Sequence, residues 1–307
     1  MKKLFLLSSI AICVLTSCSE DHQNLEQTPS SINYPEELSN SNKKVPDSLQ
    51  HLKEYLINDL KFKEDDIAFK NNEFILEDDM TISIEGLLYT IDFIKQQGID
   101  LTAHYASNGC GAFSPSPVHA EFCPGKNCSH DDEIYEIAVD ISGSVPFAWR
   151  QATINAMNNW NNLQNNRFTF ILEDRNCDIR AWDGIEVYLY SSNNSATLAS
   201  ASLPAQVPGY AIKINTNSLS YASNNIPLFT RVMMHEFGHT IGYRHTDKTD
   251  GCFIPGSANS DGASLMNSLL IPNYIGQGFS NADINAHNLL YPSANNSARF
   301  VEFKCRI

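Results

Sequence analysis

A short stretch in the last third of the chain carries the residues best suited to metal chemistry. His235 and His239 lie four positions apart, so on a helix their imidazoles share one face and can bind one metal ion. Glu236 lies beside them, where a carboxylate can take a proton from a metal-activated water. Gly242 can adopt the left-handed conformation that ends a helix. The turn would bring His245 back, so we expect one metal ion held by three histidines.

Zinc is the metal that this ligand set suits best. Three neutral imidazoles with an open fourth position are typical of catalytic zinc sites, whereas structural sites use four protein ligands. The spacing also matches an extended zinc-site signature that is normally followed downstream by a Met-turn. Met266, within Ser264-Leu265-Met266-Asn267, lies at a suitable distance. We therefore expect one catalytic Zn²⁺, with Met266 forming a hydrophobic floor under its ligands.

Three other side chains are candidates for supporting roles. Tyr243 and Tyr274 could each stabilise an oxyanion, and a structural role is the alternative for both. Asp247, just past the third histidine, could orient a neighbouring group, or it could be a solvated loop carboxylate. These two roles stay open for each residue.

The elements around the histidines predict an α+β domain with a mixed twisted sheet. Alternating or apolar runs predict strands at 135–141, 167–173, 185–190 and 210–215, and helical spacing predicts helices from Pro146, around the histidines, and at 281–291. The inner side of the first helix is expected to carry Trp149, Ile154, Met157 and Trp160. We expect the zinc helix to pack beneath the sheet, and strand 210–215 to offer the edge to which an extended peptide substrate adds.

Local signals also define the ends and the buried face of these helices. Pro227 fits the first turn of the zinc helix, and Ser280 is a plausible N-cap for the last helix. Met233, Phe237 and Ile241 recur at a spacing of four and predict a buried stripe on the zinc helix.

Residues 47–106 predict a small, separate α/β module. Helical spacing covers 47–61 and 87–94, and short strand-like pieces at 73–76 and 80–84 flank the acidic Glu77-Asp78-Asp79. This module could be an inhibitory pro-segment. Cys110, in the cysteine-rich connector 107–132, could then ligate zinc in a latent form, and a disulfide cysteine is the alternative.

The N-terminus has the features of an export signal. Lys2 and Lys3 precede an apolar run that is too short to span a membrane as a mature helix, which predicts a signal peptide over residues 1–17. The sequence before Cys18 resembles a bacterial lipobox, so we expect lipid on Cys18 and a flexible tether over 18–46; a plain secretory signal is the alternative. The acidic residues that follow predict an outer-membrane lipoprotein of the bacterial cell envelope, exposed at the surface.

Charge and cysteine usage fit this compartment. Removing residues 1–17 takes away two lysines and no acid, so the net charge moves from −14 to −16. Such a chain is a poor partner for nucleic acid or anionic lipid, and the lipid alone would be the membrane anchor. Six cysteines remain after cleavage and lipidation, namely Cys110, Cys123, Cys128, Cys177, Cys252 and Cys305, and they predict disulfides. Their pairing stays open; Cys123 and Cys128 could close a small loop, or form a second metal site with His130.

The order of elements resembles the metzincin-type zinc endopeptidases, and residues 134–292 resemble the dual-action HEIGH metallopeptidase family. The resemblance is carried by Val145-Pro146 with Trp149-Arg150, Ala156-Met157-Asn158-Asn159-Trp160, the stretch from His235 to Asp247, Met266-Asn267, and Phe279-Ser280 through Pro292. The acidic Leu76-Glu77-Asp78-Asp79-Met80 also resembles a segment that precedes the catalytic domain in such proteins. Phe237 stands where the family name has isoleucine, at a core position of the helix. The resemblance implies a metallopeptidase domain over 133–307, with the three histidines as ligands and Glu236 as catalyst.

The expected function is zinc-dependent endopeptidase activity on a protein or peptide substrate. Glu236 would accept a proton from water and deliver it to the leaving amine. The alternative is a surface binding or adhesion protein whose zinc is structural or vestigial; the presence of Glu236 favours the enzyme.

Overall fold

The computed structural model describes residues 45–97, 135–164, 168–173, 184–204, 208–218, 220–248, 261–269 and 278–291. We call 45–97 the N-terminal segment and the described residues from 135 to 291 the C-terminal segment. The eight cysteines and Tyr274 lie outside the described residues, so lipidation of Cys18, the disulfides, the latent Cys110 ligand and the oxyanion role of Tyr274 stay predictions. Among the described residues, no helix is long and apolar enough to cross a bilayer.

The described residues form one eight-stranded mixed sheet with the order β1-β2-β3-β7-β8-β6-β4-β5. The strands are β1 (Ile67–Lys70), β2 (Glu73–Leu76), β3 (Met80–Ser83), β4 (Tyr135–Ile141), β5 (Phe168–Leu172), β6 (Gly184–Tyr190), β7 (Ala199–Ser202) and β8 (Ala211–Asn215). Strands β5, β4, β6 and β8 run parallel, β7 runs antiparallel to β8, and β3 runs parallel to β7. The fold is therefore of the mixed α+β kind that the sequence predicts.

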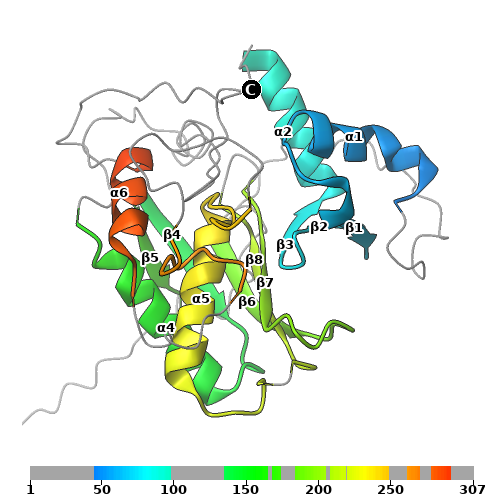
Figure 1. Ribbon diagram of the computed structural model, residues 1–307. Coiled ribbons are helices and arrows are strands. Elements are labelled where there is room, and N and C mark those ends of the chain that lie inside the picture. Colours follow the sequence, from blue (N-terminus) through cyan, green and yellow to red (C-terminus); the bar gives the residue numbers. More distant parts are fainter. Residues whose placement is uncertain are drawn as a thin grey trace, which may run out of the picture. The chain divides into compact units, whose positions relative to one another are not determined.

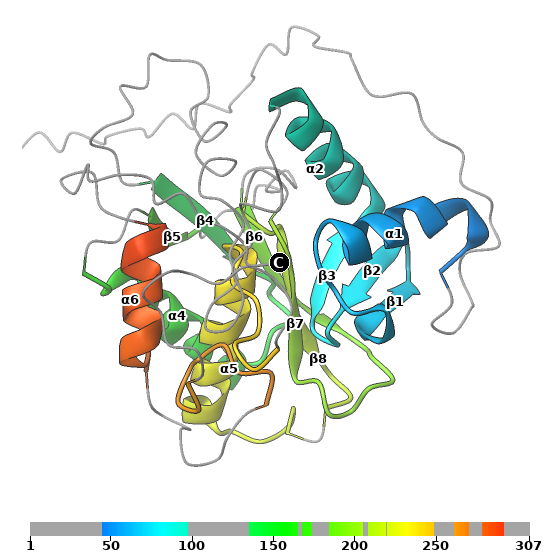
Figure 2. The same cartoon turned by 45° about the horizontal axis from the view of Figure 1, so that its top comes forward.

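Helices complete the fold (Figure 1). They are α1 (Gln50–Asn58), α2 (Ile84–Gln97), α4 (Phe147–Asn161), α5 (Ile226–Thr240) and α6 (Asn281–Leu290), with 3-10 turns η2 (Asp47–Leu49) and η3 (Glu64–Asp66). Helices α4 and α5 lie side by side in both ribbon views (Figure 2). The Trp149 ring stacks on Phe229 with centroids 3.9 Å apart, and the Trp160 indole donates to the Met234 carbonyl at 3.0 Å. This contact fixes α5, which carries the histidines, against α4.

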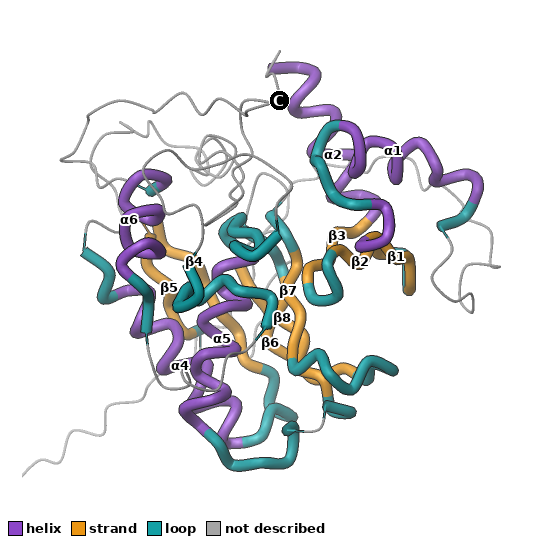
Figure 3. Tube along the Cα trace, in the orientation of Figure 1, coloured by secondary structure: helices purple, strands orange, loops and turns teal. Residues whose placement is uncertain are grey.

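The core follows the apolar spacing of the sequence. Met233, Phe237 and Ile241 are buried on α5, as expected, and all five residues of β8 are buried beside it. On α4 the two tryptophans and Met157 are buried, whereas Ile154 is only half-buried, so its expected place on the inner side is wrong in part. Figure 3 shows α4 and α5 running alongside the strands of the sheet.

Two strands escape the sequence analysis, and one prediction about a strand is wrong. The expected order has three strands between the first helix and the zinc helix, but β7 adds a fourth, and β1 precedes β2. Strand β8, which covers the predicted strand 210–215, is bonded to β6 on one side and β7 on the other. It is therefore internal and cannot be the edge that binds substrate. The outer neighbour of β8 is β7, whose other side pairs with β3.

Candidate metal centre

The zinc helix is built by local signals at both ends. At its start the Asn225 side chain accepts a hydrogen bond from the Leu228 N–H at 3.2 Å, and Pro227 lies in the first turn, as expected. At its end Gly242 adopts a φ of 100°, which is costly for any other residue. Tyr243 N–H donates to the Gly238 carbonyl and Gly242 N–H to that of His239, which is the Schellman pattern. The turn returns the chain to the histidine face of the helix.

The three predicted ligand histidines come together at this turn. The Nε2 atom of His235 lies 2.9 Å from that of His239 and 3.3 Å from that of His245. All three side chains are buried. Four ligand atoms placed tetrahedrally about 2.0–2.1 Å from zinc would lie about 3.3 Å from one another. The spacing of the Nε2 atoms therefore suits one zinc ion between them.

Each imidazole is oriented by an acceptor at its other nitrogen. His235 Nδ1 lies 2.9 Å from the Leu265 carbonyl, and His239 Nδ1 lies 2.7 Å from the Tyr243 carbonyl. A carbonyl only accepts, so Nδ1 carries the proton in both rings and Nε2 presents a lone pair. Lone pairs that face one another at these distances repel unless a cation lies between them. The ring orientations thus fit a metal ion better than an empty cluster.

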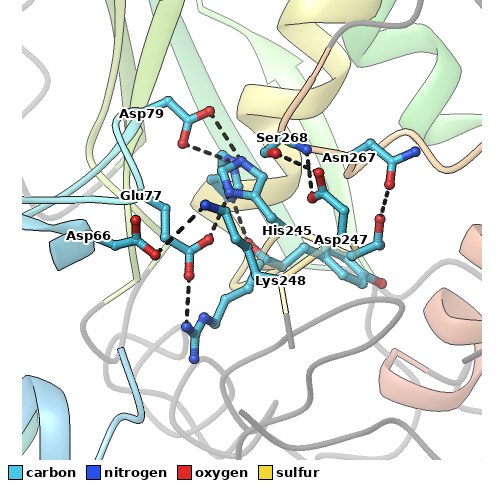
Figure 4. Close-up of polar contacts among 12 residues, drawn as sticks. Asp66, Glu77, Asp79, His245, Asp247, Lys248, Asn267 and Ser268 are labelled. Atoms are coloured by element: carbon cyan, nitrogen blue, oxygen red, sulfur yellow. Dashed lines mark hydrogen bonds and ion pairs between the residues drawn. The ribbon is translucent and has the colours of Figure 1, made fainter. Parts of the chain in front are cut away.

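Asp79 is the fourth member of the cluster, and it comes from the N-terminal segment. One atom from each of Asp79, His235, His239 and His245 lies within 4.8 Å of all the others, as a metal site requires. The carboxylate Oδ2 of Asp79 lies 3.1 Å from His245 Nε2 and 3.6 Å from His235 Nε2 (Figure 4). The other oxygen, Oδ1, is buried and has no hydrogen-bond partner among the described residues. The open fourth position that the sequence predicts is therefore filled by a carboxylate in this arrangement.

Glu77 supports the third histidine from the same turn. Its Oε2 lies 2.8 Å from His245 Nδ1, and its Oε1 accepts from the Arg244 guanidinium at 2.9 Å. Figure 4 shows Glu77 and Asp79 both directed at His245. Neither the place of Asp79 in the metal cluster nor the contact of Glu77 with His245 was predicted from the sequence. The acidic run 77–79 was noticed, but nothing local says that it meets residues more than 150 positions away.

The electrostatics of the cluster favour a cation. Burial alone would lower the pKa of His245, but the carboxylates of Asp79 and Glu77 outweigh it and raise that pKa to about 10. Burial would likewise raise the pKa of Glu77, yet the hydrogen bond from His245 and the charge of Arg244 hold it at about 2. The same negative charges of Asp79 and Glu77 also favour a divalent cation beside His245.

Glu236 lies within the electrostatic reach of this cluster. Its side chain is buried, and Oε2 has no hydrogen-bond partner among the described residues. Burial, together with the negative charge of Asp79, raises the pKa of Glu236 well above its ordinary value. An unpaired buried carboxylate is costly in a protein interior unless a ligand or water meets it.

Met266 lies beneath the helix, as the Met-turn prediction requires. A Cβ placed on Gly238 would come within 2.5 Å of the Met266 sulfur and 2.9 Å of its methyl carbon. Glycine at this position between the first two histidines therefore lets the methionine approach the helix backbone. The Met266 carbonyl also accepts from the Thr246 N–H at 3.0 Å, next to His245.

Asp283 on α6 holds the loop that carries Met266, which the sequence analysis did not foresee. Its carboxylate accepts from the Leu265 N–H at 2.7 Å and from the Ser264 hydroxyl at 2.6 Å. It also completes a capping box with Ser280, which is the N-cap that the sequence predicts. Leu265 therefore connects α6 to the metal cluster, since its N–H bonds to Asp283 and its carbonyl orients His235.

The two other candidates with described positions have structural contacts. Asp247 is exposed and accepts from the N–H and hydroxyl of Ser268, at 2.9 and 2.6 Å (Figure 4). Its carboxylate bonds to no ligand histidine within the described part of the chain. The Tyr243 hydroxyl lies 3.1 Å from His287 Nδ1 in the core. Tyr243 contributes to the site through its carbonyl, which orients His239.

Comparison with known families and structures adds the following findings. The sequence profile of the dual-action HEIGH metallopeptidase family matches residues 127–284, just over half of the chain. No curated protein matches. Two structures of myroilysin are 16% identical, with TM-scores of 0.35 and 0.34; they cover 51% and 59% of this chain and 80% and 97% of theirs. High choriolytic enzyme 1, a hatching enzyme zinc-protease from the medaka fish Oryzias latipes, is 21% identical with a TM-score of 0.30, over 54% of this chain and 92% of its own. With identities and TM-scores this low, the structural likenesses support no argument.

Proposed function

The chain belongs to the dual-action HEIGH metallopeptidase family, and from that premise we propose that it is an endopeptidase in which three histidines hold zinc and Glu236 moves the protons. Membership makes the chain a zinc metallopeptidase that acts on proteins or peptides. The convergence of the Nε2 atoms of His235, His239 and His245, each ring oriented from behind, is the observation that carries the assignment of ligands.

The chain's own residues supply the positioning and the proton transfer. Zinc, when bound, polarises a peptide carbonyl and lowers the pKa of a water molecule. Glu236 accepts the proton of the attacking water at its buried carboxylate and delivers it to the leaving amine. Met266 keeps the floor of the site apolar, and the acceptors at each Nδ1 turn the three imidazoles so that their Nε2 atoms face the metal position.

The test is the substitution Glu236→Gln, with Glu186→Gln as the matched control because Glu186 is exposed on β6. Loss of the proton-transfer group is expected to lower kcat/KM on a quenched peptide by about 10²–10⁴-fold, while zinc stays at one ion per chain. Both substitutions are made in the full chain and again in the Asp79→Asn chain, because Asp79 lies at the metal position. Full activity of the zinc-loaded Glu236→Gln variant in both backgrounds would contradict the assignment.

One observation favours the alternative of a binding protein with structural zinc. With Asp79, the cluster offers four protein ligands, as structural sites do. A buried carboxylate such as Glu236, whose Oε2 has no hydrogen-bond partner among the described residues, has no use in such a site. Asp79 also comes from outside the residues that the family profile matches. Cleavage of casein by the zinc-loaded protein, lost with a chelator and restored with zinc, would exclude the alternative.

We also propose that lipid on Cys18 anchors the enzyme at the outer membrane, facing the cell surface. The basic residues, apolar run and lipobox-like sequence before Cys18 support it. Labelling with a radioactive fatty acid is expected for the natural chain and for Cys13→Ser, and not for Cys18→Ser. Equal labelling of the Cys18→Ser chain would contradict the proposal. Surface exposure is tested by digestion of intact cells with an added protease.

A further inference from the structure

We infer that the N-terminal segment, residues 45–97, is an intramolecular inhibitor of this peptidase, with Asp79 closing the metal site and β3 covering the strand edge where a peptide would bind. The inference rests on the proposed function, because it describes how the same site is regulated. Four sets of contacts carry it.

The first is the position of the Asp79 carboxylate. Its oxygens lie 3.1 Å from His245 Nε2, 3.6 Å from His235 Nε2 and 3.8 Å from His239 Nε2, so it faces all three ligand atoms. Catalytic zinc sites hold three protein ligands and keep the fourth position for water or substrate. With Asp79 in that position, neither the water nor the peptide carbonyl has a place to bind.

The second is the turn that delivers Asp79. Leu76 and Met80 are paired across the β2–β3 hairpin, so residues 77–79 form its tip. Glu77 and Asp78 have φ values of 52° and 77°, a left-handed conformation that is unfavourable for glutamate. The contacts of Glu77 with Arg244 and His245 offset this strain. These contacts thus hold the tip in the conformation that places Asp79 at the three histidines.

The third is the burial of Arg244, which directly precedes the ligand His245. Its guanidinium donates to the Leu60 carbonyl at 3.0 Å and to Glu77 at 2.9 Å, and it lies 3.8 Å from the ring centre of Phe62. These three partners all belong to the N-terminal segment. The arginine is only 2% exposed, and a buried charge needs such partners, so this interface is a docked one with specific contacts.

The fourth is the edge of β7. Strand β3 pairs with β7 through the Ala201 N–H, which donates to the Asp79 carbonyl at 2.9 Å, and the Leu203 N–H, which donates to the Thr81 carbonyl at 2.8 Å (Figure 2). An extended peptide recognised by a sheet needs a free edge of this kind. Asp79 therefore occupies the metal position with its side chain and the strand edge with its carbonyl. A peptide substrate would need both places.

A further ion pair, which includes no residue of the metal cluster, also holds the N-terminal segment in place. Glu73 on β2 accepts from the buried Lys213 ammonium and from the Tyr210 hydroxyl, both on the C-terminal segment. Lys213 is 7% exposed. This pair allows the docking to be weakened without touching any metal ligand.

The consequence is a latent enzyme that becomes active when the N-terminal segment leaves the site. No covalent step at the metal is needed, since release frees the fourth position and the β7 edge together. Weakening either Asp79 or the docking contacts should therefore raise activity.

The first experiment compares Asp79→Asn with Asp78→Asn in the full chain loaded with Co²⁺ in place of zinc. Asp78 is the exposed neighbour in the same turn, so both variants lose one carboxylate charge from one loop. The visible absorption of cobalt reports its ligands without any need for catalysis. We expect the spectrum to change for Asp79→Asn and to stay unchanged for Asp78→Asn. Identical spectra for both variants would overturn the inference.

The second experiment measures peptide cleavage and includes Glu73→Lys, with Glu85→Lys on the exposed face of α2 as its control. We expect Asp79→Asn and Glu73→Lys each to raise kcat/KM by about tenfold or more, because apparent affinity scales with the fraction of open enzyme. Asp78→Asn and Glu85→Lys should match the natural chain. If the natural chain is as active as both Asp79→Asn and Glu73→Lys, the inference is overturned.

The two proposals fail in different ways. If cobalt spectra show Asp79 as a ligand but no variant cleaves any peptide, the endopeptidase assignment is wrong and the ligand assignment stands. If all chains cleave equally and Glu236→Gln does not, the function stands and the inhibitor is overturned.

Discussion

At the scale of single residues, the Met266 side chain lies so close to Gly238 that a Cβ at position 238 would force the methionine to move. A Cβ there would meet the methionine sulfur at 2.5 Å. Gly238→Ala is therefore expected to lower the free energy of unfolding by about 1–3 kcal/mol, because Met266 must move. Urea unfolding measures it, with Gly262→Ala as the control, since a Cβ there meets nothing within 4 Å. Equal stability of the two variants would contradict the packing.

Gly242 offers a second test at this scale. Its φ of 100° ends the helix and brings His245 to the cluster. Gly242→Ala should cost about 1–2 kcal/mol, because a Cβ is unfavourable in this region. Gly242→Asn should cost less, since asparagine tolerates left-handed conformations better. Thermal unfolding of both variants checks the order, and a larger loss for asparagine than for alanine would contradict it.

At the scale of elements, helix α6 is expected to act on the metal cluster through Asp283. In Asp283→Ala the Leu265 N–H loses its acceptor in the core, at a cost of about 1–3 kcal/mol. Because the Leu265 carbonyl orients His235, zinc affinity should also fall by about 10–100-fold. Competition with a chromophoric chelator measures the affinity.

The control is Asp247→Asn, because the sequence analysis considered Asp247 as a residue that could orient a neighbouring group at the site. Asp247 is exposed and contacts Ser268, so its zinc affinity should match that of the natural chain. A loss at Asp247 as large as that at Asp283 would reverse this assignment of roles.

The sequence predicts the elements that carry local signals and misses those that depend on distant partners. The zinc helix has an apolar stripe, a proline in its first turn and a terminal glycine, and all three act as expected. Strand β7 reads Ala-Ser-Ala-Ser, without the β-branched or aromatic residues that mark a strand, and its partners on both sides stabilise it. Because the sequence analysis did not predict β7, it placed β8 at the edge of the sheet. In the structure β7 pairs with β8, so the predicted substrate edge is wrong.

At the scale of the whole molecule, the cluster joins residues that lie far apart in the chain. Asp79 and His245 are 166 positions apart, and no local pattern encodes such a pairing. The three histidines span eleven residues and were predictable for the same reason: their geometry is set by one helix and one turn.

Removal of zinc should therefore loosen the whole described fold. The negative charge of Asp79 lies close enough to Glu236 to raise the pKa of that carboxyl, and a cation would offset this repulsion. Zinc at a hundred times its Kd should stabilise the chain by about 2.7 kcal/mol. Calorimetry is expected to show a lower Tm after dialysis against chelator and recovery with Zn²⁺ but not Mg²⁺. An unchanged Tm in the metal-free protein would contradict a metal shared by both segments.

The most direct test of the account is anomalous diffraction at the zinc edge from crystals of the full chain. The account predicts one peak about 2.0–2.1 Å from the Nε2 atoms of His235, His239 and His245 and from a carboxylate oxygen of Asp79. A peak at other residues, or one at the three histidines with water in place of Asp79 while residues 45–97 remain docked, would contradict it.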